Sequence, residues 1–192
     1  MVYTMVFEVD GGCRRNGQPR PLGAAACCLQ MRSGRKHYAR TERLPSNPSP
    51  TNQRAEITAI SMALKWALEK YDEDNICARL NVIIKSDSKY AVNAMSDWIY
   101  KWSSNGWVNS AGYEVANRDL IQQASRLDDR VRELGSVRYE WIPREDNIDA
   151  DRHCNDSLDE QEDEEGQNFS STIAGLEGVK YAWEYDPWLD SD

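Results

Sequence analysis

Apolar residues alternate with polar ones, or run continuously, in three stretches of the N-terminal quarter, at residues 4–9, 23–31 and 37–44. Breaks rich in Gly and Pro separate these stretches. A period of two is typical of a strand with one buried face, and short connections favour antiparallel pairing. The pattern therefore predicts three antiparallel strands, the first of which runs directly into Asp10.

From residue 51 the period changes to that of a helix. Small and apolar side chains recur there at three- and four-residue spacing, at Ala55, Ala59, Met62, Ala63, Trp66 and Ala67. Such a stripe is typical of an amphipathic helix that packs on a sheet. Glu56 lies one position away from the stripe, near the first turn of the predicted helix.

The rest of the pattern completes an α/β fold. It predicts a strand at 80–85, a helix through Trp98, a helix at 115–134, a strand at 137–142 and a helix from Asn147. A strand that returns through a helix implies a right-handed crossover and parallel pairing with the first strand. We therefore expect one five-stranded mixed sheet, three antiparallel strands followed by two parallel ones, with helices on its faces.

Composition limits the possibilities further. A chain of 192 residues that is 40% hydrophobic can bury one substantial core. The five cysteines form an odd set without a C-x-x-C pair, and no signal-like apolar run follows Met1. We therefore expect a reducing compartment, the cytoplasm or nucleus, with neither disulfides nor a structural zinc. No apolar run is long enough to span a bilayer, so we expect no membrane partner.

Charge is distributed unevenly along the chain. Residues 155–192 contain twelve acidic residues and one basic residue, a net charge of −11, and the total of −9 leaves +2 for residues 1–154. We expect a domain at 1–154 and an acidic tail at 155–192, solvated or disordered at 156–165. Aromatic residues among the acids of this tail favour docking on the domain or on a partner protein; these are Tyr181, Trp183, Tyr185 and Trp188.

Four carboxylates lie where predicted strands and helices meet. Asp10, Glu56 and Asp87 occupy three such junctions, and Asp151 ends the stretch Asn147-Ile-Asp-Ala-Asp. Carboxylates that gather repel one another unless cations neutralise them, and hard divalent metals prefer oxygen ligands. Two such ions are enough to hydrolyse a phosphodiester. The alternative is that these are ordinary surface acids, which most Asp and Glu residues are.

Four motifs then occur in a recognisable order. They are Asp10-Gly-Gly-Cys-Arg-Arg-Asn-Gly, Thr51-Asn-Gln-Arg-Ala-Glu-Ile, Ser86-Asp-Ser and the Trp-rich segment 98–112. Each motif is weak alone, but together they resemble the eukaryotic-like branch of type 1 ribonuclease H over about residues 6–151. The resemblance implies the ribonuclease H-like fold and an endonuclease, and we expect the protein to be a monomer. The resemblance also implies that the enzyme cuts the RNA strand of RNA–DNA hybrids with two Mg²⁺ ions, for which Mn²⁺ can substitute.

The resemblance also assigns roles to individual residues. Asp10, Glu56, Asp87 and Asp151 would be the catalytic metal ligands, with Asp10 bridging both ions. The implied substrate-binding residues are Gly11, Cys13, Asn16, Thr51, Asn52, Gln53, Trp98, Trp102, Ser110 and Asn117. Three amides in this set would contact the 2′-hydroxyl groups that distinguish RNA from DNA, namely Asn16, Asn52 and Gln53. Thr51 and Asn117 would bind a DNA phosphate, and Trp98 and Trp102 would line the DNA-strand channel.

Some of these residues have a structural alternative. Thr51 or Asn52 suits the N-cap of the helix that carries Glu56. Trp98 and Trp102 are spaced as on one helix face, so core packing is the alternative, and for Trp102 it explains the spacing equally well; we assign Trp107 to the core. Glu145 and His153 are expected to be solvated, and His37 has no assigned role.

The chain departs from the family pattern in three places. Ser49 replaces a basic residue of the phosphate pocket, and residues 101–118 contain only two basic residues where the family has a Lys-rich protrusion. The family's His-containing loop before the last aspartate is absent from residues 143–151. We therefore expect weak, less salt-dependent hybrid binding. A second hypothesis follows, in which the chain is a weakly active or inactive nucleic-acid-binding or protein-interaction module.

Overall fold

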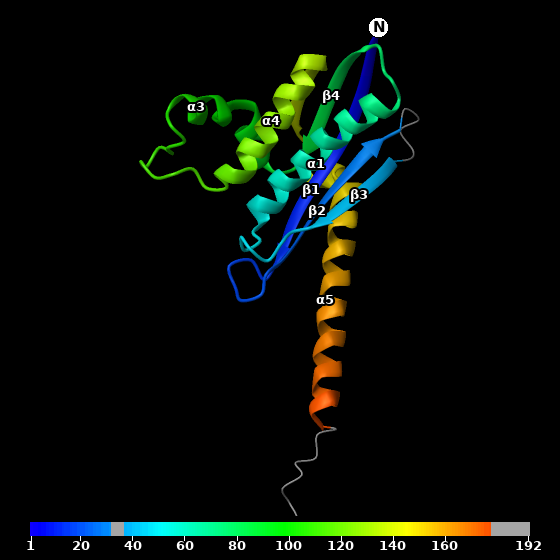
Figure 1. Ribbon diagram of the computed structural model, residues 1–192, viewed down its shortest axis with the longest axis vertical. Helices are drawn as coiled ribbons and strands as arrows, with labels where there is room; N and C mark the ends of the chain where they lie inside the picture. The colour runs from blue at the N-terminus through cyan, green and yellow to red at the C-terminus, as the bar shows by residue number, and fades with distance from the viewer. Residues whose placement is uncertain (32–36, 178–192) are drawn as a thin grey trace, which may run out of the picture. The chain divides into compact units, whose positions relative to one another are not determined.

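The computed structural model describes residues 1–31 and 37–177, with side chains to residue 167 (Figure 1). A single mixed sheet has the strand order β3-β2-β1-β4-β5. The strands are β1 (Val2–Arg14), β2 (Leu22–Gln30), β3 (His37–Arg43), β4 (Arg79–Ser86) and β5 (Gly135–Trp141). β1 pairs antiparallel with β2 and β2 with β3, whereas β4 is parallel to both β1 and β5. This topology confirms the predicted fold class.

The helices follow the predicted order. The helix after β4 runs without a break but has three parts. A π-helical turn, Ala94–Trp98, joins two α-helical segments. The helices are α1 (Asn52–Glu73), α2 (Lys89–Asn93), α3 (Ile99–Ser104), α4 (Arg118–Leu134) and α5 (Ile148–Glu177), with a 3₁₀ turn at Arg144–Asp146. No helix in the described part of the chain is both long and apolar enough to cross a membrane.

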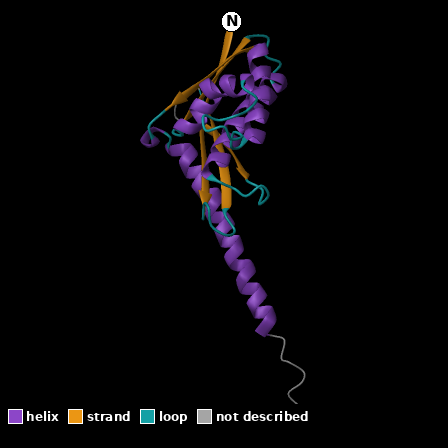
Figure 2. Ribbon diagram, turned by 90° about the vertical axis from the view of Figure 1, so that its left-hand side faces the viewer, coloured by secondary structure: helices purple, strands orange, loops and turns teal. Residues whose placement is uncertain are grey.

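Helices cover both faces of the sheet (Figures 1 and 2). Alternate residues of β2 show how the faces divide, because side chains along a strand point to opposite sides. Ala25 and Cys27 belong to the main core with α1 and α4, whereas Ala24 and Ala26 pack against the start of α5. The first turns of α5 therefore lie on the face opposite α1.

The compact unit that contains the sheet ends at Leu158, four residues beyond the predicted domain boundary. Residues 156–165, where the sequence predicts a solvated or disordered stretch, are part of α5. Cys154 and Leu158 lie four residues apart and are buried against β2, which anchors this part of the helix. The Glu residues that follow are good helix formers. The aromatic residues from Tyr181 to Trp188 lie outside the described residues.

Thr51 fixes the start of α1. Its side chain accepts a hydrogen bond from the Arg54 backbone N–H at 3.2 Å, so Thr51 is the N-cap and Asn52 is the first helical residue. This decides between the two predicted caps, and it leaves the Asn52 side chain available for another contact.

Gly11 permits a close approach of β1 to the first turn of α1. A Cβ atom at this position would lie 2.2 Å from the backbone carbon of Ala55 and 2.2 Å from the backbone nitrogen of Glu56. No other residue fits, because both neighbouring atoms belong to the main chain and cannot rotate away. The contact places Glu56 beside the residue that precedes Gly11, which is Asp10.

Gly11→Ala is therefore expected to lower the free energy of unfolding by at least about 2 kcal/mol, because strand and helix must separate. Thermal or urea unfolding of the purified chain measures the effect. Gly166→Ala is the matched control, since a Cβ atom there meets nothing within 4 Å. Equal stability of wild type and Gly11→Ala would show that this close approach is not a constraint on the fold.

Candidate active site

Three carboxylates from three different elements meet at one edge of the sheet. Asp10 lies on β1, Glu56 near the start of α1, and Asp87 directly after β4. Val9 pairs with Ser86 in the parallel ladder, so the residues that follow them, Asp10 and Asp87, emerge side by side. Each of the three carboxylates offers an oxygen within 4.8 Å of the others. The predicted meeting of these residues is thus present in the structure.

The environment of this cluster disfavours negative charge. Burial raises the pKa of Asp10 to about 6, with further contributions from Asp87 and Asp151. Burial, followed by the charges of Asp10 and Asp87, raises the pKa of Glu56 to about 9. A bound cation would relieve both effects, since it favours the ionised form of each ligand.

One oxygen of Glu56 identifies the point at which such a cation fits. Glu56 Oε2 is buried and accepts no hydrogen bond from the described residues, although Ser86 hydrogen-bonds to this carboxyl group. A buried acceptor without a partner is costly and is rare in folded proteins. Together with the all-oxygen donor set, it suits a hard divalent ion.

Asp151 lies near the cluster but is engaged elsewhere. Arg144 donates a short hydrogen bond to Asp151 Oδ1, and Asn155 Nδ2 donates to Asp151 Oδ2 at 3.1 Å. The charge of Asp151 still raises the pKa of Asp10. Asp151 does not join the group of three within 4.8 Å, so its role as a fourth ligand stays a prediction.

Two residues of the site were not anticipated from the sequence. Asn147 is fully buried and donates from Nδ2 to the Val9 carbonyl at 3.0 Å and to Asp87 Oδ1 at 3.2 Å. Asn147 therefore orients Asp87 against β1. Arg144 pairs with Asp151 and lowers the pKa of both Asp10 and Glu56. Both residues belong to the stretch Pro143-Arg-Glu-Asp-Asn147, which precedes α5.

The cluster opens into a pocket of about 430 Å³. The Asn52 side chain is part of the pocket lining and accepts a hydrogen bond from the Cys13 backbone N–H at 2.8 Å. Asn16 and Gln53 are exposed. The residues that line the pocket include Asp10, Gly11, Cys13, Asn52, Glu56, Asp87 and Arg144. The predicted contacts of Gly11, Cys13 and Asn52 therefore share one hollow with the carboxylates.

A second hollow, of about 540 Å³, contains Trp98, Trp102 and Ser110 in its lining. The centroids of the two indole rings lie 5.6 Å apart, and both rings also pack against the main core. The core-packing interpretation is therefore confirmed for both rings, and their contact with a DNA strand stays a prediction. Trp107 is partly buried and packs against Trp102.

An ion pair links the N-terminal ends of α1 and α4. Arg54 donates two hydrogen bonds to the Asp119 carboxylate, at 3.0 and 2.7 Å. Thr51 caps α1, and Asn117, which precedes α4, donates from Nδ2 to the Tyr90 hydroxyl at 3.3 Å. Helix N-termini attract anions, and the phosphate-binding role of Thr51 and Asn117 stays a prediction.

The surroundings of His153 differ from the prediction. His153 is half-buried, and its Nε2 atom lies 3.0 Å from Nε2 of His37, so the prediction that His153 is solvated is wrong. The reason is that β3 and α5, more than 100 residues apart in sequence, place the two rings together. Glu145 is exposed, as predicted.

Comparison with known proteins identifies the family. The family model described as RNase H matches residues 3–161. The chain is 32% identical to ribonuclease HI of Neisseria meningitidis serogroup A over 142 residues, 74% of this chain and 83% of that protein. It is 29% identical to human ribonuclease H1 over 164 residues, 83% of this chain and 51% of the human protein.

Solved structures agree on the fold. RNase H1 from Halobacterium salinarum superposes with a TM-score of 0.57 at 18% identity, over 82% of this chain and 99% of that one. The foamy viral protease-reverse transcriptase in complex with dsDNA superposes with a TM-score of 0.61 at 22% identity, over 80% and 92% of the two chains.

The raised pKa values predict how stability depends on pH in the metal-free protein. Both folded-state values exceed the usual values of about 3.9 for Asp and 4.3 for Glu. The stabilising contribution is therefore fully present below about pH 4, and it is lost as the pH rises through about 6 for Asp10 and about 9 for Glu56.

In the presence of a chelator, Glu56→Gln is expected to raise the Tm by a few degrees at pH 8 and by almost nothing at pH 4. The exposed residue Glu133 supplies the control, Glu133→Gln. A Glu56→Gln protein that melts like wild type at pH 8 would contradict the buried, protonated Glu56.

Proposed function

Because the chain belongs to the ribonuclease H family and is a type 1 ribonuclease H, we propose that it hydrolyses the RNA strand of RNA–DNA hybrids by two-metal-ion catalysis. The observation that carries this proposal is the convergence of Asp10, Glu56 and Asp87, with one buried oxygen of Glu56 lacking a partner among the described residues. The family match and this donor set point to the same chemistry.

The ligand set favours Mg²⁺, with Mn²⁺ as a substitute, since both accept carboxylate oxygens. Asp10, Glu56 and Asp87 would hold the ions, and Asp151 would complete the set once Arg144 releases it. When bound, such ions supply an activated water and neutralise charge on the phosphate.

The protein's own residues prepare this site. Asn147 holds Asp87 through its Nδ2 atom, and Ser86 hydrogen-bonds to Glu56. Arg144 offsets part of the negative charge around Asp10 and Glu56. These contacts fix the directions of the carboxylates before substrate arrives, which avoids reorganisation during the reaction.

Substrate would occupy the two hollows. The hydrogen bond from Cys13 to Asn52 holds that amide at the wall of the carboxylate pocket, where its Nδ2 group can donate to a ribose 2′-hydroxyl. Gln53 and Asn16 are exposed and can make similar contacts. Trp98 and Trp102 line the second hollow and would offer an apolar surface to the DNA strand. Five free cysteines favour a reducing compartment, so we place the activity in the cytoplasm or nucleus.

One observation favours the second candidate, a weakly active or inactive nucleic-acid-binding module. The Asp151 carboxylate is already paired with Arg144 and Asn155. If that pairing persists when hybrid binds, the fourth ligand stays unavailable and turnover is slow. Binding without cleavage would then be the observed activity.

Asp10→Asn is expected to reduce hybrid cleavage at least about 100-fold, because Asp10 is the central ligand of the cluster. The loss of one charge from a repulsive group should leave the fold intact. A labelled RNA–DNA hybrid, assayed with Mg²⁺ and with Mn²⁺ separately, measures the rate.

Asp72→Asn, a change of the same kind at an exposed position of α1, is the matched control and should cleave like wild type. If Asp10→Asn retains the wild-type rate, the two-metal proposal is wrong. If the wild-type chain binds hybrid without cutting it in either metal, the binding-module candidate replaces the enzyme.

Asn52→Ala is expected to raise the KM for hybrid by about 3- to 10-fold, the range for loss of one hydrogen bond, with a smaller effect on kcat. The exposed Asn93 provides the comparison, Asn93→Ala. Steady-state kinetics on hybrid and on hybrids with single 2′-deoxy substitutions distinguish the roles. An Asn52→Ala enzyme with an unchanged KM would remove Asn52 from the substrate contacts.

A further inference from the structure

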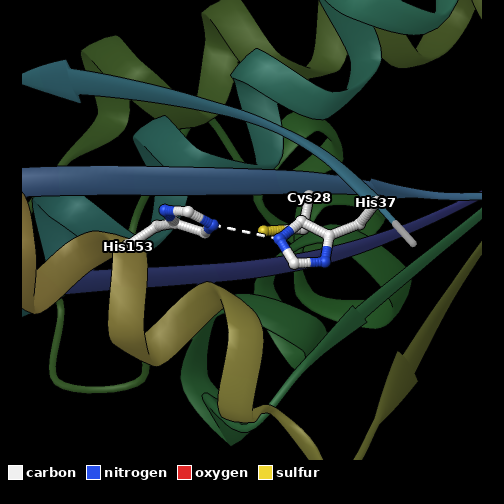
Figure 3. A group of neighbouring side chains, drawn as sticks. All are labelled: Cys28, His37 and His153. Carbon is white, nitrogen blue, oxygen red and sulfur yellow. Dashed lines mark hydrogen bonds between the residues drawn. The ribbon is translucent and has the colours of Figure 1, made fainter. Parts of the chain in front are cut away.

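A cluster of nitrogen and sulfur donors lies on the face of the sheet that α5 covers. It consists of Cys28 on β2, His37 on the edge strand β3 and His153 on α5 (Figure 3). Each residue offers one donor atom within 4.8 Å of the other two. In Figure 3 the two imidazole rings point toward each other from β3 and α5, with the Cys28 sulfur beside the line that joins them.

The strand register explains why these side chains share one face. Cys28 lies directly opposite Glu8 of β1, and His37 lies opposite Gln30 of β2, two residues beyond Cys28. Residues that are opposite or two apart in neighbouring strands project to the same side. Ala24 and Ala26 lie on this side as well, where they pack against Cys154 of α5. His153 precedes Cys154 and is thereby brought over the sheet.

We propose that Cys28, His37 and His153 bind one Zn²⁺ ion, which holds β2 and the edge strand β3 to the first turns of α5. The donors are those that zinc prefers, and water would complete a tetrahedral set. Mg²⁺ is the ion of the oxygen-only cluster and is not suited to this one. This proposal does not rest on the proposed nuclease activity.

The distances suit a tetrahedral ion. The two Nε2 atoms lie 3.0 Å apart. Zinc lies about 2.0–2.1 Å from an imidazole nitrogen, so two such ligands of a tetrahedral ion are about 3.4 Å apart. A movement of a few tenths of an ångström therefore converts the observed contact into shared coordination. His37 is only 16% exposed, which limits access of water to its ring.

The surroundings supply the contacts that metal-binding histidines require. Asp149 Oδ2 lies 3.0 Å from Nδ1 of His37, and Arg152 donates to the other oxygen of Asp149 at 3.0 Å. A neutral His37 that donates from Nδ1 to Asp149 has its lone pair on Nε2, the atom that faces the cluster. A carboxylate behind a ligating histidine is a frequent arrangement in zinc sites, where it fixes the tautomer.

The local field attracts a cation. Burial, and then the charges of Asp149 and Glu8, raise the pKa of the Cys28 thiol to about 12. The thiol must lose its proton when it binds a metal, and the ion's charge compensates for the same carboxylates that oppose ionisation. Without a metal, the two Nε2 atoms share one hydrogen bond, and the residues form only a hydrogen-bonded chain.

Metal binding to the purified full-length chain distinguishes the two arrangements. The metal-depleted protein is titrated with Zn²⁺ against a chromogenic chelator, and with Co²⁺, which reports thiolate ligation and tetrahedral geometry in its absorption spectrum. We expect one tightly bound ion per chain and a thiolate-to-cobalt band. Saturating Zn²⁺ should raise the Tm by about 5 °C or more.

Variants assign the ligands. Cys28→Ser, His37→Ala and His153→Ala should each abolish the thiolate-to-cobalt band and reduce the Zn²⁺-dependent rise in Tm. Cys77→Ser, which alters an exposed thiol, and Asp10→Asn, which alters the acidic cluster, should preserve the band. His153→Gln provides a milder change if His153→Ala does not fold. A missing cobalt band in the wild type overturns the proposal. So does a band that survives both His153 variants or disappears in Cys77→Ser.

Discussion

The close contact between β1 and the first turn of α1 is the constraint on which the active site depends. Gly11 lacks the Cβ atom that would strike the backbone of Ala55 and Glu56. The contact forces Glu56 next to Asp10, and the parallel pairing of β1 with β4 adds Asp87. Burial, and then the charges of neighbouring acids, oppose ionisation of Asp10 and Glu56 and raise the pKa values of both. The fold thus builds a site that is electrostatically incomplete without a cation.

The fold brings together two different sets of side chains that can bind a metal ion. One lies where β1 and β4 meet the start of α1, and the other lies on the face of the sheet that α5 covers. Asp10, Glu56 and Asp87 offer only oxygen, whereas Cys28, His37 and His153 offer nitrogen and sulfur. Helix α5 connects the two sets, since Asp151 lies near the acids and His153 lies two residues further along, in the second cluster. A clamp at His153 would therefore also restrain the residue proposed as the fourth carboxylate ligand.

Much of the fold was predictable because periodicity reports local burial. Alternation located the strands, the stripe from Ala55 to Ala67 located α1, and the crossover rule gave the parallel pairing. The meeting of Asp10 with Asp87 followed from that pairing.

Arg144 and Asn147 were missed because a polar residue in a short connecting segment has no periodic signal. The pairing of His37 with His153 was missed because zinc ligands are recognised in sequence by close spacing, and these lie far apart. The helical character of 156–165 was not predicted, because the acidic composition suggested solvation rather than secondary structure.

Proton release on metal binding tests the central claim most directly. At pH 7.5 the Glu56 carboxyl, with a pKa of about 9, is protonated in the metal-free protein. Calorimetric titration with Mg²⁺ in buffers of different ionisation enthalpy measures the protons lost per ion bound. The account predicts release of about one proton from the wild type and almost none from Glu56→Gln. Mg²⁺ binding without proton release, or equal release from both proteins, would contradict a metal centre built on Glu56.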